Sequence, residues 1–335
     1  MRYSPLFMLL LLVFPSCEQE PASPVDLTPY VLELPPHFPY PSIPEDNKLT
    51  EARVALGKQL FYEPALSMDS TISCASCHKQ ALAFADDLPI SPGVKGRLGF
   101  RNSPTLANLA YLSVVNKDGG VPKLDLQALV PIEDHAEMGL SVLQAADRLN
   151  EDPYYRDAFE KAYGDLANPF TITRALGAFQ RTLISANSTY DQYLMGEVSL
   201  SPAQERGRLL FFSEQTDCSS CHGSFNFTEN GFFNNGLYTT YEDWGRRRVT
   251  GLPEDDGVFR VPTLRNITMT APYMHDGSLP DLQAVLQHYN SGGTAHPNKD
   301  ARIRPLQLSE QQLLDLEAFL HTLTDTAFLT DPRFQ

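Results

Sequence analysis

The chain has 335 residues, of which 42% are hydrophobic, and its formal net charge at pH 7 is −15. This length accommodates two domains of ordinary size, each with its own buried core. Because the acidic residues are spread along the chain and no basic patch interrupts them, the composition argues against binding to nucleic acid or to anionic lipid.

Residues 1–17, MRYSPLFMLLLLVFPSC, have the pattern of an export signal. One arginine precedes an apolar run from Leu6 to Phe14 that is too short to span a bilayer. Cleavage before Cys17 would leave an N-terminal cysteine able to carry a lipid anchor in the outer leaflet, and plain secretion is the alternative. The sequence therefore predicts a periplasmic protein, either free or anchored as a lipoprotein.

Residues 18–48 are rich in proline and in acidic side chains. Such a composition is typical of an extended linker, because proline stiffens the chain and offers little apolar surface for a core. We therefore expect folded structure to begin near residue 49.

Two Cys-x-x-Cys-His motifs contain every cysteine that follows Cys17. They are Cys74, Cys77 and His78 in the first motif, and Cys218, Cys221 and His222 in the second. Two short disulfides or two redox-active pairs would explain the cysteines but not the histidine that follows each pair. The pattern indicates covalent haem c, in which the thiols form thioethers with the haem vinyl groups and the histidine is the proximal iron ligand.

The stretches before the two motifs resemble each other. LGKQLF at 56–61 and RGRLLF at 206–211 share a glycine, a basic residue and a final phenylalanine, which indicates an internal duplication. We expect two tandem cytochrome c-like domains, 49–195 and 196–335, each holding one covalent c-type haem.

Helical periodicity supports a mainly α fold. Ile172, Leu176, Phe179 and Leu183 recur at helical spacing within 171–194. A second helix is expected within 309–323, where Ser309 can cap the first turn and four leucines form an apolar stripe. Alternating strand patterns are scarce.

From about residue 49 to 325 the chain resembles the bacterial dihaem cytochrome c peroxidase family, which includes the methylamine-utilisation maturase MauG. The similarity lies in six stretches that occur in the family's order: ISCASCH, RNSPTLANLAY, LQALVPIEDHAEMG, CSSCH, VPTLRNITMTAPYMHDGSL and LQHYNSGG. The resemblance implies an enzyme whose first haem meets hydrogen peroxide. The second haem would pass or store electrons delivered by a small redox protein, a cytochrome c or a cupredoxin.

The resemblance also implies two catalytic side chains. Glu137 matches the family's catalytic glutamate, which moves a proton between the two peroxide oxygens, and Gln127 matches its partner glutamine. Without the resemblance both would be interpreted as surface residues. Glu133 and Asp134 are expected to be solvated charges.

A calcium ion between the haems is a further implication of the resemblance. The matching ligands are the side chain of Asn102 and the peptide oxygens of Thr270 and Pro272, which are the hard donors that calcium accepts. Without the family pattern Asn102 and Pro272 would be interpreted as turn and loop residues.

The chain departs from typical peroxidases at the first haem. Lys95 stands where a histidine closes the inactive resting form, and no histidine lies between His78 and His135. We therefore expect the distal side of the first haem to have no protein ligand, and Lys95 to be solvated.

A second departure concerns the second haem. Tyr289 takes the place of the family's methionine ligand, as it does in MauG, and a phenolate favours ferric iron more than a thioether does. His288, Met269 and Met274 are rival ligands, and an ordinary helix aromatic is the simplest alternative for Tyr289.

A third departure removes the tryptophan that precedes Asp-Gly between the haems. Lys117 occupies that position, and Trp244, the only tryptophan, lies in the loop after the second motif. Tyr111 is a candidate substitute whose place in the fold the sequence leaves open.

These features predict a dihaem peroxidase that reduces hydrogen peroxide with electrons from an external donor. A MauG-like oxidase that modifies a partner protein is one alternative, which Tyr289 favours and Lys117 disfavours. A dihaem electron carrier without catalysis is the other, and it would require both irons to be six-coordinate.

Overall fold

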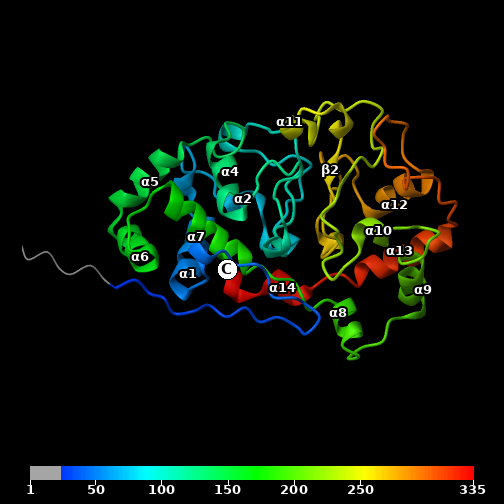
Figure 1. Cartoon of the computed structure of the whole chain (residues 1–335), viewed down its shortest axis with the longest axis horizontal. Coiled ribbons are helices and arrows are strands. Elements are labelled where there is room, and N and C mark those ends of the chain that lie inside the picture. The colour runs from blue at the N-terminus through cyan, green and yellow to red at the C-terminus, as the bar shows by residue number, and fades with distance from the viewer. Residues whose placement is uncertain (1–23) are drawn as a thin grey trace, which may run out of the picture.

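The computed structural model describes residues 24–335. These residues are mostly helical and contain one two-stranded sheet (Figure 1). The predicted signal and Cys17 lie outside these residues. Within the described part, no helix combines the length and the apolar character that crossing a bilayer requires.

The helices of the first half include the short helix of the first cysteine motif. They are α1 (Glu51–Phe61), α2 (Cys74–Cys77), α3 (Leu124–Gln127), α4 (Leu129–Glu133), α5 (Val142–Glu151), α6 (Pro153–Tyr163) and α7 (Pro169–Arg181). Those of the second half are α8 (Thr189–Leu194), α9 (Pro202–Phe211), α10 (Ser219–His222), α11 (Arg247–Thr250), α12 (Leu282–Ser291), α13 (Glu310–His321) and α14 (Thr326–Thr330). The strands β1 (Phe232–Phe233) and β2 (Phe259–Arg260) pair antiparallel, with Phe232 opposite Arg260.

The predicted helices begin where capping side chains allow. Asn168 accepts hydrogen bonds from the backbone N–H groups of α7, and Ser309 accepts one from Gln312 at the start of α13, as expected. The helical pattern at 171–194 is interrupted after Arg181, because the N–H groups of Ala186 and Asn187 donate to the carboxylate of Asp325 instead of continuing the helix. Helix α8 then restarts after the Ser188 cap.

Two equivalent helix pairs form the centres of the two halves. Helix α1 packs on α7, and α9 packs on α13. A Cβ on Gly57 would lie 1.9 Å from the carbonyl oxygen of Ala175, and one on Gly207 would lie 1.8 Å from that of Asp315. Each crossing therefore needs a glycine on the first helix, which explains why the two similar stretches both contain one.

Two hydrophobic cores correspond to these pairs. One contains buried residues from 32 to 183 and the other contains buried residues from 190 to 323. The chain end departs from this division, because Phe328 and Phe334 pack into the first core against Phe84. In Figure 1 the red C-terminal segment accordingly returns beneath the first half of the molecule.

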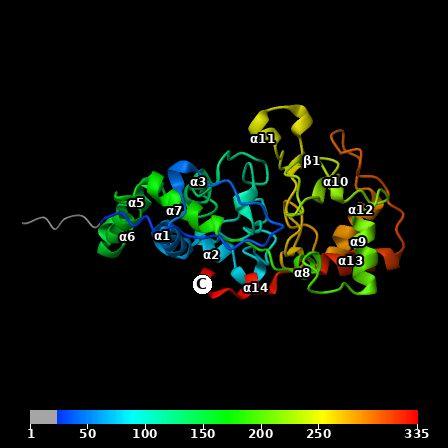
Figure 2. The same ribbon diagram turned by 60° about the horizontal axis from the view of Figure 1, so that its bottom comes forward.

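The proline-rich segment 24–48 is extended but packed against the protein. It runs along the molecule towards α8 and then turns back to α1 (Figure 2). Leu32 and Phe38 are buried, and His37 Nε2 lies 2.9 Å from a carboxylate oxygen of Asp191 in α8. The described part of the expected linker therefore contacts both halves.

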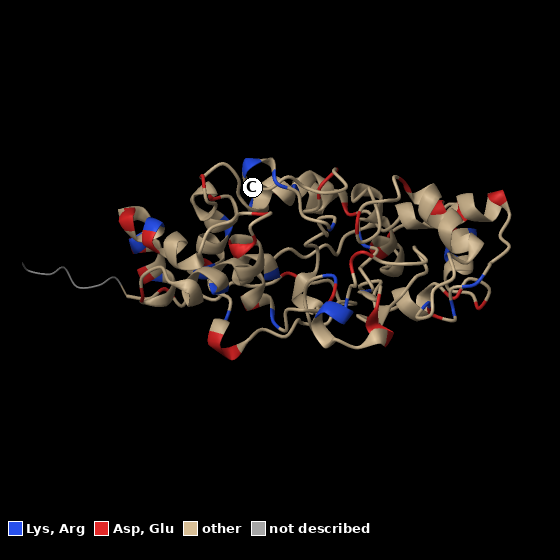
Figure 3. Cartoon of the chain, turned by 90° about the horizontal axis from the view of Figure 1, so that it is seen from above, with Lys and Arg blue, Asp and Glu red and all other residues tan. Residues whose placement is uncertain are grey.

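Charged residues of both signs are interspersed along the whole molecule (Figure 3). Buried ion pairs such as Arg181 with Asp125 and Arg265 with Asp191 lie inside the two halves.

Candidate active site

The first cysteine motif forms a single helical turn, α2, followed by a tight loop. His78 Nδ1 lies 2.8 Å from the carbonyl oxygen of Phe84, a residue whose φ of 58° turns the chain back towards the histidine. Burial lowers the pKa of His78, so the imidazole is neutral. Because Nδ1 must carry the proton that it donates to this carbonyl, Nε2 has the lone pair that a metal ligand needs.

The second motif repeats this arrangement. His222 Nδ1 lies 3.1 Å from the carbonyl oxygen of Phe227, and burial lowers the pKa of His222 to about 4. The loop residue Phe227 also has a positive φ, of 51°. Each half therefore presents one neutral histidine fixed through Nδ1, with Nε2 facing away from its own loop.

The four cysteines stand beside these histidines as unpaired thiols. Burial raises the pKa of Cys74 to about 12 and that of Cys77 to about 11, and it also raises the pKa of Cys218 and Cys221. The thiols are therefore protonated at neutral pH, which disfavours binding of a metal ion as thiolates.

A largely apolar cavity opens beside the second motif. Its wall includes Cys218, Cys221 and His222 on one side and residues of α12 and α13 on the other. The apolar lining includes Leu264, Leu282, Val285, Leu286, Leu306, Leu316 and Leu320. A flat apolar macrocycle attached to the two cysteines would fit this lining and would face His222 Nε2.

Two of the four candidate second ligands line that cavity. Tyr289 of α12 and Met274 are both in its wall, and Met274 Sδ lies 3.2 Å from the side-chain amide nitrogen of Asn235. His288 Nε2 is engaged with the backbone carbonyl oxygen of Asn235 at 3.1 Å. Neither His288 nor Met269 belongs to the lining. Burial raises the pKa of Tyr289, so its hydroxyl keeps its proton unless a cation displaces it.

Glu137 lies in the turn that follows α4. Its backbone oxygen accepts a hydrogen bond from Val94 N at 2.8 Å, which holds the turn against the loop containing Lys95. The negative charge of Glu137 raises the pKa of both Cys74 and Cys77, which places the carboxylate on the side of the first motif. The side chain is exposed at this surface but backed by protein, and this partial burial, with the charge of Asp134, raises the pKa of Glu137 to about 7.

Neither Gln127 nor the side chain of Lys95 forms a hydrogen bond with Glu137 in the described chain. Gln127 is the last residue of α3 and is half-buried. Lys95 is exposed in a left-handed turn with a φ of 59°, as expected for a solvated lysine.

Asn102, one of the predicted calcium ligands, contacts a loop of the second half of the chain. Asn102 N–H donates to the carbonyl oxygen of His275 at 2.8 Å, which brings Asn102 beside the loop that contains Thr270 and Pro272. No described residue donates a hydrogen bond to Asn102 Oδ1 or to the carbonyl oxygens of Thr270 and Pro272. Three oxygen donors suited to calcium are thus unengaged, although no cluster of three or more acidic, histidine or cysteine side chains among residues 24–335 could hold a metal.

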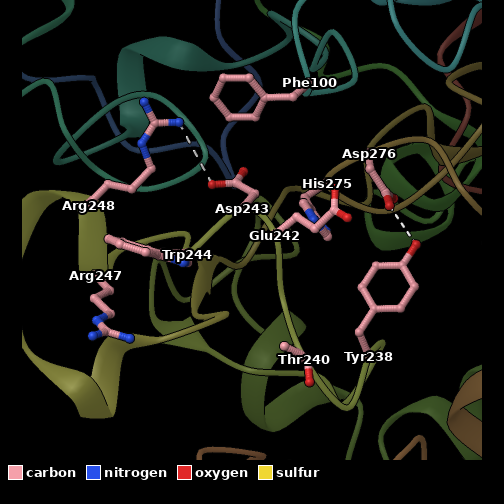
Figure 4. A pocket seen from close by; sticks show the side chains of 10 residues that line it. All are labelled: Phe100, Tyr238, Thr240, Glu242, Asp243, Trp244, Arg247, Arg248, His275 and Asp276. Carbon is pink, nitrogen blue, oxygen red and sulfur yellow. Dashed lines mark hydrogen bonds and ion pairs between the residues drawn. The ribbon is translucent and has the colours of Figure 1, made fainter.

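The aromatic candidates for an inter-haem relay lie elsewhere. Trp244 is 52% exposed and lines a surface groove together with Phe100 and His275 (Figure 4). Tyr111 donates its hydroxyl hydrogen to the carbonyl oxygen of Pro39 at 2.9 Å. Neither aromatic lines the cavity beside His222.

Several residues of the cavity carry no motif and were not expected. Phe259 and His275 stack with ring centroids 4.2 Å apart, and His275 lines both the surface groove and the cavity. Arg260 of β2 lines the cavity beside Lys117. Arg260 N–H donates to the carbonyl oxygen of Lys117, a residue far away in the sequence, so no local sequence signal identifies this pair.

Comparison with known proteins defines the class of this fold and site. A model of the family described as di-haem cytochrome c peroxidase matches residues 51–199. The cytochrome c551 peroxidase of Pseudomonas aeruginosa is 32% identical over 82% of this chain and 80% of its own. The chain belongs to the di-haem cytochrome c peroxidase family, which confirms the resemblance found in the sequence.

Within that family the similarity extends to MauG proteins. The methylamine utilization protein MauG of Methylorubrum extorquens is 36% identical over 298 residues, which are 87% of this chain and 83% of that protein. The crystal structure of a MauG-like protein associated with microbial copper homeostasis superposes with a TM-score of 0.86 at 36% identity, covering 91% of this chain and 99% of that one. The diheme peroxidase BthA of Burkholderia thailandensis, at 22% identity and a TM-score of 0.75, shares the fold.

Proposed function

We propose that the protein is a dihaem c-type peroxidase that reduces hydrogen peroxide to water with electrons from an external donor. The observation that carries this proposal is the asymmetry between two otherwise equivalent histidine centres. Glu137, a carboxylate with a pKa of about 7, lies on the side of the first motif, whereas Tyr289 and Met274 line the cavity of the second. One centre is thus equipped for proton transfer and the other for holding an iron on both faces.

Haem attached through the four cysteines would supply irons that react with peroxide and exchange electrons. His78 and His222 would hold these irons through Nε2, because Nδ1 of each ring is committed to a backbone carbonyl. The two equivalent helix pairs support one such unit in 49–195 and a second in 196–335, with the chain end packed on the first.

Glu137 would act on the peroxide itself. With a pKa near 7, both its protonated and its ionised forms are populated at neutral pH. It accepts a proton from one peroxide oxygen and returns it to the other, so that water leaves. Gln127, at the end of α3, assists by orienting the substrate. Two electrons and two further protons complete the reduction of one peroxide to two waters.

The proposed peroxidase also has a calcium site, a periplasmic location and a redox partner. Asn102, Thr270 and Pro272 hold a calcium ion that ties the two halves together through the contact of Asn102 with His275. The protein works in the periplasm, where a small cytochrome c or cupredoxin delivers electrons. A lipid on Cys17 would tether it to the membrane surface.

The decisive experiment combines electron paramagnetic resonance of the ferric protein with peroxide turnover. Protein made in a host with haem-maturation machinery should contain two haems by mass and show one high-spin and one low-spin signal. It should oxidise two equivalents of a reduced one-electron donor per peroxide. Replacing Cys74 and Cys77 by alanine should remove one haem, the high-spin signal and the turnover. Two low-spin signals without turnover would identify an electron carrier instead.

A second candidate function is that of a MauG-like oxidase that uses peroxide to modify a partner protein. The presence of Tyr289 in the cavity favours it, as does the 36% identity to MauG of Methylorubrum extorquens. Such an enzyme would consume peroxide while altering the mass of a partner protein and would turn over poorly with the small donor.

A further inference from the structure

Two cations beside the second motif have no ion-pair partner among the described residues. Lys117 and Arg260 both line the cavity next to His222, and neither forms an ion pair within residues 24–335. Lys117 Nζ has one hydrogen bond, to the backbone oxygen of Met274 at 3.3 Å. The Arg260 guanidinium has only backbone acceptors, Asn116 O at 3.3 Å and Val261 O at 3.4 Å.

Three other enclosed arginines are paired with carboxylates. Arg101, close to Lys117, is paired with Asp118 and Asp243, and Arg265 is paired with Asp191. Arg302, which also lines the cavity, is paired with Asp300. The fold therefore supplies carboxylates to these three guanidinium groups and leaves Lys117 and Arg260 without a carboxylate partner.

The backbone fixes Lys117 and Arg260 as neighbours. Arg260 N–H donates to the carbonyl oxygen of Lys117 at 2.7 Å, and β2 holds Arg260 opposite Phe232 of β1. Burial, followed by the charges of Arg101 and Arg260, lowers the pKa of Lys117 to about 7, and burial lowers that of Arg260 to about 10. Two adjacent enclosed cations are unfavourable unless an anion compensates them.

The group that the second motif is proposed to hold would bring that anion. A c-type haem carries two propionate carboxylates, and charge-assisted hydrogen bonds from lysine and arginine to carboxylates are among the strongest that proteins form. Because both cations lie in the wall of the same cavity as Cys218, Cys221 and His222, a haem attached there would present its carboxylates within the space that they border.

We propose that Lys117 and Arg260 bind the propionates of the second haem, and that the charge of Lys117 makes this haem easier to reduce than it would be beside a neutral residue. The inference rests on the proposed haem at Cys218 and Cys221. Its physical reason is electrostatic, since a positive charge near the iron favours the ferrous state, which has one positive charge fewer. Lys117 would thereby oppose the ferric preference that a Tyr289 phenolate confers. Lys117 and Arg260 are positioning residues, because they act on the haem potential and do not touch the substrate.

The test is a spectroscopic redox titration of the haem-loaded full chain without peroxide. Lys117→Met removes the charge and keeps the length of the side chain, and Lys117→Arg keeps the charge. Lys123→Met, at an exposed lysine six residues away, is the matched control. We expect Lys117→Met to shift the ferric-to-ferrous equilibrium of the low-spin haem at least tenfold towards ferric, which is about 59 mV for one electron. The high-spin haem, Lys117→Arg and Lys123→Met should all remain close to wild type.

Each other outcome is equally informative. If Lys117→Met fails to retain the second haem while Lys117→Arg retains it, the propionate role is supported through haem retention. If Lys117→Met keeps both haems with an unchanged low-spin midpoint, or shifts both haems equally, the inference is wrong while the proposed peroxidase stands. A wild-type protein without haem at the second motif would overturn both.

Discussion

At the scale of single residues, Glu137 offers the most direct test of catalysis. The pKa of about 7 means that the ionised form, which can accept a proton from peroxide, becomes dominant only above neutral pH. We predict that Glu137→Gln, which keeps the size of the side chain but cannot accept the proton, lowers peroxide turnover about 10²-fold with unchanged haem content. Turnover by the wild type should rise from pH 5 to pH 8, and this rise should be absent in the variant.

Glu133→Gln is the matched control for that prediction. Glu133 is an exposed acid in the same segment, and its carboxylate accepts a hydrogen bond from Val142 N that a glutamine oxygen can also accept. The turnover and the pH profile of Glu133→Gln should equal those of the wild type. Equal turnover in Glu137→Gln would assign proton transfer to another group.

The second residue-scale prediction concerns the iron ligand at the cavity beside His222. If Tyr289 holds that iron, Tyr289→Phe should convert the low-spin ferric signal into a second high-spin signal, because phenylalanine leaves the position open. His288→Ala should not, since His288 Nε2 is engaged with Asn235 O. Met274→Leu is the critical comparison, because Met274 lines the same cavity. Loss of the low-spin signal in Met274→Leu alone would make methionine the ligand.

At the scale of secondary structure elements, Gly57 and Gly207 allow the close approach of α1 to α7 and of α9 to α13. In Gly57→Ala the new methyl group would meet the Ala175 carbonyl of α7, and in Gly207→Ala it would meet the Asp315 carbonyl of α13. We predict that each substitution lowers the free energy of unfolding by roughly 1–3 kcal/mol, because the helices must separate. Chemical denaturation measures the effect. Gly99→Ala, where nothing lies within 4 Å of the added carbon, should change stability little, and an equal loss there would refute this explanation.

The elements also explain what the sequence could and could not reveal. The cysteine motifs, the similar stretches before them and the Ser309 cap are local, so their meaning does not depend on the rest of the chain. The interruption of the helix after Arg181 depends on Asp325, which lies 138 residues beyond Asn187. The neighbouring positions of Lys117 and Arg260 likewise depend on a hydrogen bond between residues far apart in the sequence, which leaves no local pattern. The assignments of Glu137, Tyr289 and Asn102 came from family resemblance, and they stay predictions.

At the scale of the whole molecule, the end of the chain stabilises the first half. Phe328 and Phe334 pack on Phe84, whose carbonyl oxygen accepts the hydrogen bond from His78. The Gln80 side chain donates to the backbone oxygens of Phe328 and Asp331. This contact joins residues that are more than 240 positions apart in the sequence.

We predict that Phe328→Ala lowers the free energy of unfolding by about 3–5 kcal/mol, because a buried aromatic ring leaves a cavity in the first core. Denaturant titration followed by circular dichroism checks this value. Leu314→Ala, at an exposed position of α13, should be nearly neutral. A similar small effect for both substitutions would show that the chain end contributes little to the first core.

The return of the chain end to Phe84 has a consequence for biosynthesis. The chain is expected to be exported with its N-terminus first, so residues 326–334 reach the periplasm after residues 24–325. Until then Phe84, and with it the loop that carries the carbonyl partner of His78, lacks two aromatic neighbours. The segment around Cys74 and Cys77 is therefore expected to stay open to a periplasmic haem-attachment machinery until residues 326–334 arrive and pack against Phe84.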